Sequence, residues 1–366
     1  MPGTPYICRM YSRIRYPDTV SPTELDRFLE SGWRCAGQAI YTAHFMRFPA
    51  NAEGRIYSTL PTRLPLQGYQ FKKRLRKLWR RNERRFRVEA GAPFVYDEAA
   101  KEVQRRYEAA FPDRGLADED EYRNKPQGPF TFDTRSVRIY DGDRLAAFSI
   151  FNLGAYSMYS SQGIYDPDYA RHSLGFFTML AEVQFGLEQG FLYYYPGYVV
   201  PGYEEFDYKL RIGDMEYYDL SSDAWHPYRE LKEEDVPINR IQAGLETVQK
   251  QLAQSGVAAH LAEYALFDIR FYETAGLPFV EHPLVLLCDS PQPKRYCPVV
   301  VRCPRSWRYD VLNVKFFGLG VHHLPTYRAI LRERPSLIRE PMAAMKVLAE
   351  GLKQEEAGTF LLENAY

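Results

Sequence analysis

The residues best suited to chemistry lie between Tyr165 and Lys209, where small residues, tyrosines and one lysine are concentrated. Ser173 and Gly175 stand where a loop turns into a helix, and small residues there let a ligand approach the free backbone N–H groups at the helix start. Such donors suit a phosphate or a carbonyl oxygen on which negative charge develops. We therefore expect a ligand to bind around Leu174 and Gly175.

A group of tyrosines follows this helix. Each offers a flat face on which a nucleic-acid base can stack and a hydroxyl that can form a hydrogen bond. The chain holds 29 tyrosines, so most of the group must be structural. Its members are Tyr193, Tyr194, Tyr195, Tyr198, Tyr203 and Tyr208, and Lys209 comes directly after the last of them.

A strongly basic run, KKRLRKLWRRNERRFR, covers residues 72–87 and contains a single acid, Glu83. On a helix its apolar residues fall broadly on one face and its cations on the remainder. An ordinary solvated helix is one interpretation. So much uncompensated positive charge favours a polyanion surface instead, with phosphate contacts that position a nucleic acid without reading its bases. The expected contacts are Lys73, Arg76, Lys77, Arg80 and Arg84.

The composition is that of a soluble globular protein, with 366 residues of which 45% are hydrophobic and 26% charged. The length suggests two or three compact units. Because the formal net charge is zero, any polyanion surface must come from local clustering of Lys and Arg. No apolar run reaches the roughly 18 residues that cross a bilayer, and the N-terminus lacks the apolar stretch of a signal peptide. We expect a cytoplasmic protein.

The cysteines predict no metal site. None of the five is spaced as C-x-x-C, and an odd number suits a reducing compartment. Near the N-terminus only two are present, which are too few and too far apart for a four-cysteine site. They are Cys8 and Cys35, and the others are Cys288, Cys297 and Cys303.

The first part of the chain, residues 1–115, reads as an α/β unit. A capping signal at Ser21 and Glu24 predicts a helix through Leu29. Residues 39–48 alternate like strands, and the basic run predicts a helix over residues 70–87, followed by a charged helix over 98–111. Residues 116–129 carry turn formers and alternating charge, and we expect a linker there.

Residues 130–226 form a second expected unit with a mixed α/β pattern. Asp141-Gly142 predicts a hairpin turn, Pro167 a sharp turn, and Gly190 the end of a helix. The expected strands cover 137–140, 145–151, 158–165 and 191–195, and the helix covers 175–187.

Residues 227–366 form an extension to which no role is assigned. Within it, residues 238–252 have the pattern of an amphipathic helix, and 284–287 and 299–301 the pattern of strands. Residues 342–352 are expected to form a last helix.

The order and spacing of the motifs over roughly residues 20–220 resemble the arginyl-tRNA–protein transferase family, which includes bacterial leucyl-transferring relatives. The matching motifs are Tyr165-Asp166-Pro167, Ser173-Leu174-Gly175, Gly197-Tyr198 and Tyr208-Lys209, with Gly32-Trp33-Arg34, Tyr140-Asp141-Gly142 and Arg76 to Asn82 upstream. The resemblance implies two tandem acetyltransferase-like (GNAT) units followed by the extension.

The resemblance also implies a reaction. An amino acid, Arg or Leu, moves from charged tRNA to the N-terminal α-amine of proteins that begin with Asp or Glu, which feeds N-degron proteolysis. Charged tRNA is the co-substrate and no cofactor is expected. A catalytic role falls to Asp166, Ser173, Gly175, Tyr198 and Asp207, with the two aspartates as candidates to accept a proton from the attacking amine. Substrate binding falls to Arg171, Leu174, Tyr195, Tyr208 and Lys209, whose cation suits the acidic acceptor or the tRNA 3′ end.

Two other functions stay open. A GNAT scaffold is typical of CoA-dependent N-acyltransferases, whose R/Q-x-x-G-x-G/A loop binds pyrophosphate. The segment from Arg171 to Gly175 has the arginine but lacks the full glycine pattern. A non-catalytic relative that binds tRNA or N-termini is the other alternative, because many family members carry an N-terminal cysteine cluster where this chain has only Cys8 and Cys35.

Overall fold

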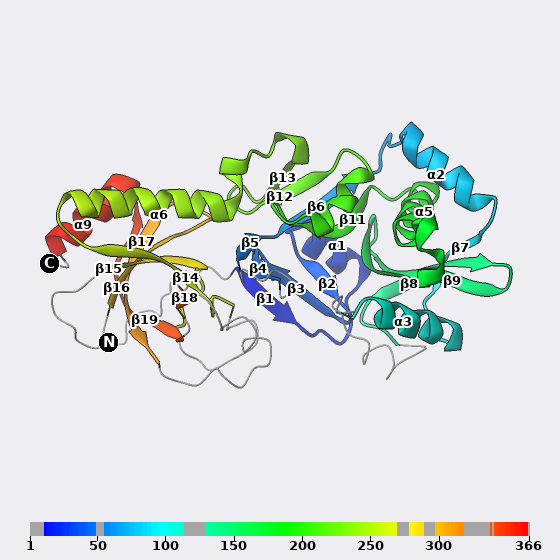
Figure 1. Cartoon of the computed structure of the whole chain (residues 1–366), viewed down its shortest axis with the longest axis horizontal. Coiled ribbons are helices and arrows are strands. Elements are labelled where there is room, and N and C mark those ends of the chain that lie inside the picture. Colours follow the sequence, from blue (N-terminus) through cyan, green and yellow to red (C-terminus); the bar gives the residue numbers. More distant parts are fainter. Residues whose placement is uncertain are drawn as a thin grey trace.

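The computed structural model describes residues 11–48, 55–112, 129–268, 278–288, 297–317, 337–338 and 340–364. Two large sheets lie at opposite ends of an elongated molecule, with the short strands β1 to β5 between them in the view of Figure 1. The eight-stranded sheet has the order β13-β12-β6-β11-β10-β9-β8-β7, and the six-stranded sheet has the order β18-β14-β15-β16-β17-β19.

The centre of the eight-stranded sheet has the strand order of a GNAT fold. Strands β8 (Asp133–Asp141), β9 (Arg144–Leu153) and β10 (Ser157–Tyr165) form an antiparallel meander. Helix α5 (Leu174–Gln189) then crosses over to β11 (Tyr193–Val199), which runs parallel to β10. The mixed α/β class, the hairpin after β8 and the helix before Gly190 are confirmed, while β11 begins and ends later than predicted.

Strands β10 and β11 soon part. They pair only from Ser157 opposite Tyr193 to Tyr159 opposite Tyr195. Beyond this, β10 stays with β9 past a bulge, and β11 pairs with the antiparallel β6 (Leu60–Pro65) past another irregularity. Because a bulge bends its strand, both strands turn away from each other at this level of the sheet.

Helices cover both faces of this sheet. The helices α2 (Lys73–Glu83) and α5 lie on one face, and α3 (Glu98–Ala110) lies on the other (Figure 1). Successive residues of β9 serve the two cores in turn, because side chains alternate along a strand. Ala147 packs in the core under α5, whereas Phe148 packs in the core under α3.

Residues 1–115 do not form a unit of their own. Strands β6 and β7 (Arg87–Pro93) lie in the same sheet as β8 to β11. Within the described part of this segment, the separate sheets are small: β1-β3-β2 (Ser12–Arg15, Ala39–Ala43, Arg34–Ala36) and β4-β5 (Phe45–Arg47, Ile56–Ser58). Sequence pattern marks a strand but not its partner, so the shared sheet was not predictable. Most of the expected linker, residues 116–128, lies outside the described residues.

Two helices of this segment follow their local signals. Helix α1 (Pro22–Glu30) begins at Ser21, whose hydroxyl accepts the N–H of Glu24 while the Glu24 carboxylate accepts the N–H of Ser21. The basic helix α2 is shorter than predicted, because the chain leaves the helix after Glu83 and enters β7 at Arg87.

The C-terminal extension folds on helix α6 (Pro237–Gln254) and a sheet of its own. The predicted helix and two predicted strands are present as α6, β15 (Leu284–Cys288) and β16 (Cys297–Arg302). The remaining elements are β14 (Ala259–Tyr264), β17 (Tyr309–Phe316), β18 (Leu337–Ile338), β19 (Met342–Leu352) and α9 (Gln354–Asn364).

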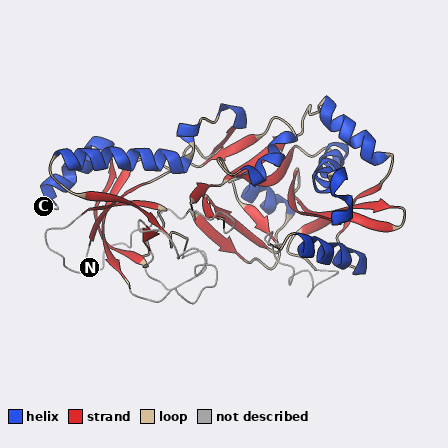
Figure 2. Cartoon of the chain, viewed as in Figure 1, coloured by secondary structure: helices blue, strands red, loops and turns tan. Residues whose placement is uncertain are grey.

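The helix predicted for residues 342–352 is wrong. This segment is strand β19, which pairs antiparallel with β17 and buries Met342, Ala343 and Ala344, and the last helix is α9 (Figure 2). The segment is rich in good helix formers, but burial against a neighbouring strand outweighs the weak intrinsic preference of its residues.

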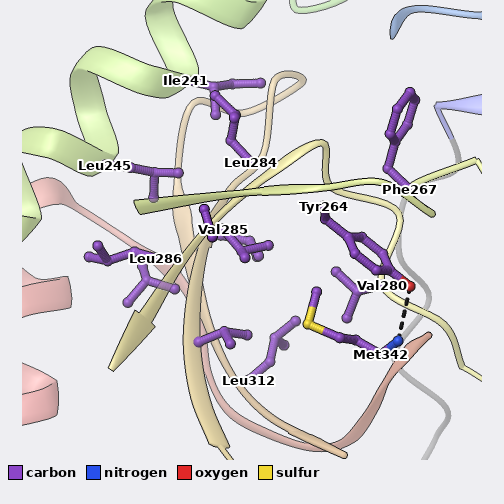
Figure 3. Close-up of a cluster of buried hydrophobic side chains, with 14 of the residues drawn as sticks. Ile241, Leu245, Tyr264, Phe267, Val280, Leu284, Val285, Leu286, Leu312 and Met342 are labelled. Carbon is purple, nitrogen blue, oxygen red and sulfur yellow. Dashed lines mark hydrogen bonds between the residues drawn. The ribbon is translucent and has the colours of Figure 1, made fainter. Parts of the chain in front are cut away.

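The extension is packed firmly onto the rest of the chain. Ile241 and Leu245 of α6 face Val285 of β15, and the Tyr264 hydroxyl accepts the N–H of Met342 at 2.9 Å (Figure 3). The same core includes Tyr11, Phe45 and Ile56 from the N-terminal part. The Ser58 hydroxyl accepts the N–H of Ile238 at 2.9 Å, so the start of α6 is held by β5.

None of the described helices is long and apolar enough to span a membrane.

Candidate functional site

Lys209 is a buried cation without an acidic partner in the described part of the chain. It lies in the 3-10 helix η2 (Glu204–Arg211), which follows β11, and is 8% exposed. Its Nζ donates to the Tyr198 carbonyl at 3.0 Å and lies 5.0 Å from the centre of the Tyr198 ring and 5.1 Å from that of Phe206. Burial, together with the charge of Arg34, lowers the pKa of Lys209 to about 7.

Arg34 is a second buried cation at the same place. It is 1% exposed on β2, and its Cζ lies 4.5 Å from the ring centre of Tyr198 and 4.8 Å from that of Tyr41. One nitrogen, Nη2, donates to the carbonyl of Ala43. Its Nε and Nη1 are buried and have no hydrogen-bond partner among the described residues. Arg34 belongs to the motif Gly32-Trp33-Arg34, but a role for it was not predictable from the sequence, because nothing in the local pattern shows that it is buried.

A glycine leaves room between these side chains. Gly197 has φ +94°, and a Cβ at this position would lie 3.4 Å from Nζ of Lys209 and 3.6 Å from the Tyr159 hydroxyl. The elements β2, β10, β11 and η2 thus meet where β10 and β11 part. We call the group Arg34, Lys209, Gly197, Tyr159 and Tyr198 the two-cation cluster. Because its cations have no carboxylate among the described residues, the cluster is suited to hold an anion.

The start of α5 has an unusual backbone. Ser173 is exposed and left-handed, with φ 56° and ψ 43°, and its hydroxyl makes no capping hydrogen bond. Its carbonyl accepts the N–H groups of Phe176 and Phe177. The N–H groups of Leu174 and Gly175 are left without an acceptor among the described residues, as is usual for the first turn of a helix. Leu174 offers only its backbone, because its side chain is buried in the core.

The two candidate proton acceptors differ in surroundings. Asp166 is buried, caps the 3-10 helix η1 (Pro167–His172), and pairs with Arg144 and, at 3.0 Å, with Arg106. Burial raises the pKa of Asp166, but hydrogen bonds from the Asp168 N–H, Arg106 and Arg144 outweigh it and lower the pKa below its ordinary value. This geometry speaks for a structural carboxylate. Asp207 is exposed on η2, and partial burial, with the charge of Glu204, raises its pKa.

The predicted substrate-binding residues are also spread over different surroundings. Tyr195 is buried and packs edge-on against Trp225, with ring centres 5.5 Å apart, so its side chain belongs to the core. Tyr208 is 40% exposed beside Phe176, near the start of α5. Arg171 is exposed and its Nε donates to His172.

Helix α2 carries the predicted basic surface. All five predicted contacts are exposed, and none forms an ion pair with a residue in the described ranges. The end of the helix is fixed beside the start of α5. The side-chain amide of Asn82 donates to the carbonyl of His172 at 3.0 Å, and Arg81 donates to the same carbonyl at 3.2 Å. The exposed cations are Lys73, Arg76, Lys77, Arg80 and Arg84.

The described residues contain no group of three His, Cys, Asp or Glu side chains placed to hold a metal ion. Cys35, Cys288 and Cys303 are buried free thiols, and burial raises the pKa of Cys35 to about 12. Cys8 lies outside the described residues.

The strand order and the open helix start define a GNAT-like transferase. Residues 71–219 match the family model described as "Arginine-tRNA-protein transferase, C terminus". Relatives named aspartate/glutamate leucyltransferase occur in Leptospira interrogans, 24% identical over 56% of this chain and 79% of the relative, and in Phenylobacterium zucineum, 32% identical over 44% and 65%. Residues 71–219 are therefore similar to the arginyl- and leucyl-transferring family, and the relatives that share this similarity are named as aminoacyltransferases.

Solved structures share the fold only loosely. L-PGS from Bacillus licheniformis is 14% identical, with a TM-score of 0.30 over 38% of this chain and 46% of that one. A GCN5-related N-acetyltransferase from Kribbella flavida is 14% identical, with a TM-score of 0.24 over 38% and 48%. The GNAT-like class therefore follows from the strand order of the chain itself.

Proposed function

We propose that the protein transfers arginine or leucine from charged tRNA to the N-terminal α-amine of proteins beginning with Asp or Glu, in the cytoplasm, and so feeds N-degron proteolysis. The observation that carries this proposal is Lys209, a buried cation without an acidic partner in the described part of the chain. An acidic acceptor supplies the missing carboxylate. The names of the leucyltransferase relatives, which specify aspartate and glutamate, support the same acceptor.

The reaction requires positioning more than covalent help, because the aminoacyl ester is already activated. The acceptor amine attacks the ester carbonyl, a C–N bond forms, the C–O bond breaks, and the ribose hydroxyl of the tRNA leaves. Negative charge develops on the carbonyl oxygen during the attack. The N–H groups of Leu174 and Gly175, beside the unusual turn at Ser173, are the donors that we assign to this oxygen.

The attacking amine must first lose the proton of its ammonium form, and the leaving ribose oxygen must gain one. Asp207 is our candidate for the acceptor, directly or through a water molecule, because it is exposed and its pKa is raised. Asp166 is not, because Arg106 and Arg144 hold it as a carboxylate. Tyr198 is assigned to orienting the acceptor through its contacts with both cations.

Charged tRNA is assigned to the surface of α2, with Tyr208 and Arg171 nearer to its 3′ end. Five exposed cations without ion pairs in the described ranges suit a phosphate backbone. The anchoring of Asn82 on the loop before α5 brings this surface next to the helix start. Phosphate contacts there would hold the tRNA while its aminoacyl end reaches Leu174 and Gly175.

The test is a transfer assay with radiolabelled Arg-tRNA or Leu-tRNA and peptides that differ only in a first residue of Asp, Glu or Lys. We expect label on the Asp and Glu peptides with one of the two donors. A parallel assay with labelled acetyl-CoA should transfer nothing. Acetyl transfer without aminoacyl transfer would replace the proposal by a CoA-dependent acyltransferase. Binding of tRNA without any transfer would leave a non-catalytic relative.

A further inference from the structure

We propose that Arg34 and Lys209 form one anion-binding site, which takes the side-chain carboxylate of the acceptor's first residue, with Arg34 as its specificity-determining member. This rests on the proposed function and extends it to a residue outside the GNAT-like core. Arg34 lies on the small β1-β3-β2 sheet, which packs Cys35 and Ile40 against Tyr159 and Tyr195 of the central sheet.

The first reason is the unbalanced charge of Arg34. An arginine side chain keeps its charge in proteins, so burial cannot neutralise it. A buried cation with unused N–H groups is strongly unfavourable unless an acceptor reaches it. Stacking on Tyr198 and Tyr41 compensates for part of this charge but satisfies no N–H group. Its Nε and Nη1 are therefore two directed donors prepared for an anion.

The second reason is that a second cation, Lys209, contacts the same tyrosine ring and has a gap beside its amine. The charge of Arg34 acts directly on Lys209, and both side chains contact the ring of Tyr198. Two like charges at one buried place repel each other, and an anion between them removes that cost. Because Gly197 has no side chain, room of about the size of a methyl group is left next to Nζ of Lys209 and the Tyr159 hydroxyl, where a Cβ would make ordinary van der Waals contacts.

The burial of the site selects a carboxylate over a tRNA phosphate. Arg34 and Lys209 are 1% and 8% exposed, so a ligand must enter on a narrow side chain. A phosphodiester is part of a bulky backbone, and exposed cations for it are already present on α2. An Asp or Glu side chain carries its carboxylate on a short apolar stem, which suits a cluster walled by Tyr41, Tyr159 and Tyr198.

The experiment compares Arg34→Met, Arg34→Lys and the wild type in aminoacyl transfer to peptides that begin with Asp or with Asn. Asn has the shape of Asp without its charge. For Arg34→Met we expect kcat/KM for the Asp peptide to fall about ten- to a hundredfold, mainly through KM, with the Asn peptide unchanged. Arg34→Lys should retain part of the preference. Arg15→Met, an exposed position on β1 of the same sheet, is the matched control and should change neither rate.

Each alternative result is decisive. If the ratio of kcat/KM for the Asp and Asn peptides is the same in Arg34→Met as in the wild type, the carboxylate site is overturned. Transfer by the wild type would still uphold the proposed function in that case. A loss of tRNA affinity with the ratio preserved assigns the site to phosphate and overturns it as well. If the wild type transfers to no peptide, the proposed function fails first.

A binding measurement tests the carboxylate site even if the wild type transfers to no peptide or if Arg34→Met does not fold. The probes are the dipeptide amides of Asp-Ala and Asn-Ala. We expect Asp-Ala amide to raise the Tm of the wild-type protein and Asn-Ala amide to leave it unchanged. Equal effects of the two probes would refute the carboxylate site. In the absence of ligand, Arg34→Met should unfold at the same or a higher temperature, because it removes an unpaired buried charge.

Discussion

The amine of Lys209 donates a hydrogen bond of 3.0 Å to the backbone carbonyl of Tyr198, and this contact holds the charged end of the side chain against the ring of the same tyrosine. A backbone carbonyl satisfies only one of the three N–H groups of an ammonium. The remaining donors face a cluster in which aromatic rings and another cation, but no described carboxylate, surround them. Acceptor recognition can therefore be tested at this one side chain.

Replacing Lys209 by Met should weaken acidic acceptors selectively. The change keeps the apolar stem and removes the charge, so it deletes a charge-assisted hydrogen bond of about 1.5–3 kcal/mol. We expect the KM for Asp and Glu peptides to rise about ten- to a hundredfold, with tRNA affinity nearly unchanged. Peptide kinetics and tRNA binding on the same preparation measure both. If tRNA binding collapses and the peptide preference survives, Lys209 faces the donor instead.

The preference for acidic peptides should decline as the pH rises through neutrality. The pKa of Lys209 is about 7, so its charge is lost above that pH, and a neutral amine attracts a carboxylate only weakly. The measurement is the ratio of kcat/KM for Asp and Asn peptides from about pH 6 to about pH 8.5. A ratio is used because the peptide α-amine, which titrates at about 8, affects both peptides alike, so its effect cancels. Lys209→Arg keeps its charge and should give a flat ratio. A wild-type ratio that rises with pH would contradict the assignment.

Local signals in the sequence were sufficient for much of the core. The capping pair Ser21 and Glu24, the turn at Gly142 and the helix stop at Gly190 each act within a few residues, and the structure contains all three features. Long-range pairing was not predictable in this way. Strand β19 has the composition of a helix, and only its partner β17 makes it a strand.

In the candidate site, too, features set by neighbouring residues were predictable and features set by distant residues were not. The basic face of α2 and the helix start at Ser173 follow from the order of residues, and both are present. The burial of Tyr195 and the ion pairs of Asp166 depend on residues far away in the chain. Arg34 contacts the ring of Tyr198, although the two residues are far apart in the sequence. No local pattern marks such a contact.

The basic face of α2 predicts salt-dependent tRNA binding. Replacing Arg76, Arg80 and Arg84 together by Ala should weaken binding and flatten the dependence of log K on log[salt] by roughly one unit for each lost phosphate contact. A matched triple variant at Arg27, Lys101 and Arg105 removes the same charge from α1 and α3, where Arg27 and Arg105 are exposed and Lys101 is half-buried. Filter binding at several salt concentrations compares them. Equal losses in both variants would show that only net charge matters, and α2 would be an ordinary solvated helix.

Activity should not depend on a metal. In the described ranges no three ligating side chains come together, and the buried thiol of Cys35 has a raised pKa, which disfavours the thiolate that binds metals. We expect elemental analysis of the purified protein to find no stoichiometric zinc or iron, and chelators to leave transfer intact. The double variant Cys8→Ser and Cys35→Ala should then transfer at the wild-type rate. Stoichiometric metal that is lost from this variant would establish a site at the N-terminus.

A side chain added at Gly197 should abolish the preference for acidic peptides. It should lower the stability of the fold about as much as a side chain added at Gly202, which lies away from the cluster. Gly197→Ala and Gly202→Ala both place a side chain at a positive φ, +94° and +82°, which costs about 1–3 kcal/mol at either position. Only at Gly197 would the new methyl group lie beside Nζ of Lys209, at 3.4 Å, whereas at Gly202 its nearest neighbour is Tyr57 at 3.9 Å.

Thermal unfolding should therefore show similar losses for the two variants, while peptide kinetics should separate them. We expect Gly197→Ala to lose about tenfold or more in kcat/KM for Asp peptides, because the methyl group excludes the carboxylate from the two-cation cluster. Gly202→Ala should keep the wild-type value under conditions in which both variants are folded. Equal kinetics in the two variants would mean that the acceptor carboxylate does not enter beside Gly197, and that the cations of the cluster stabilise something other than the acceptor.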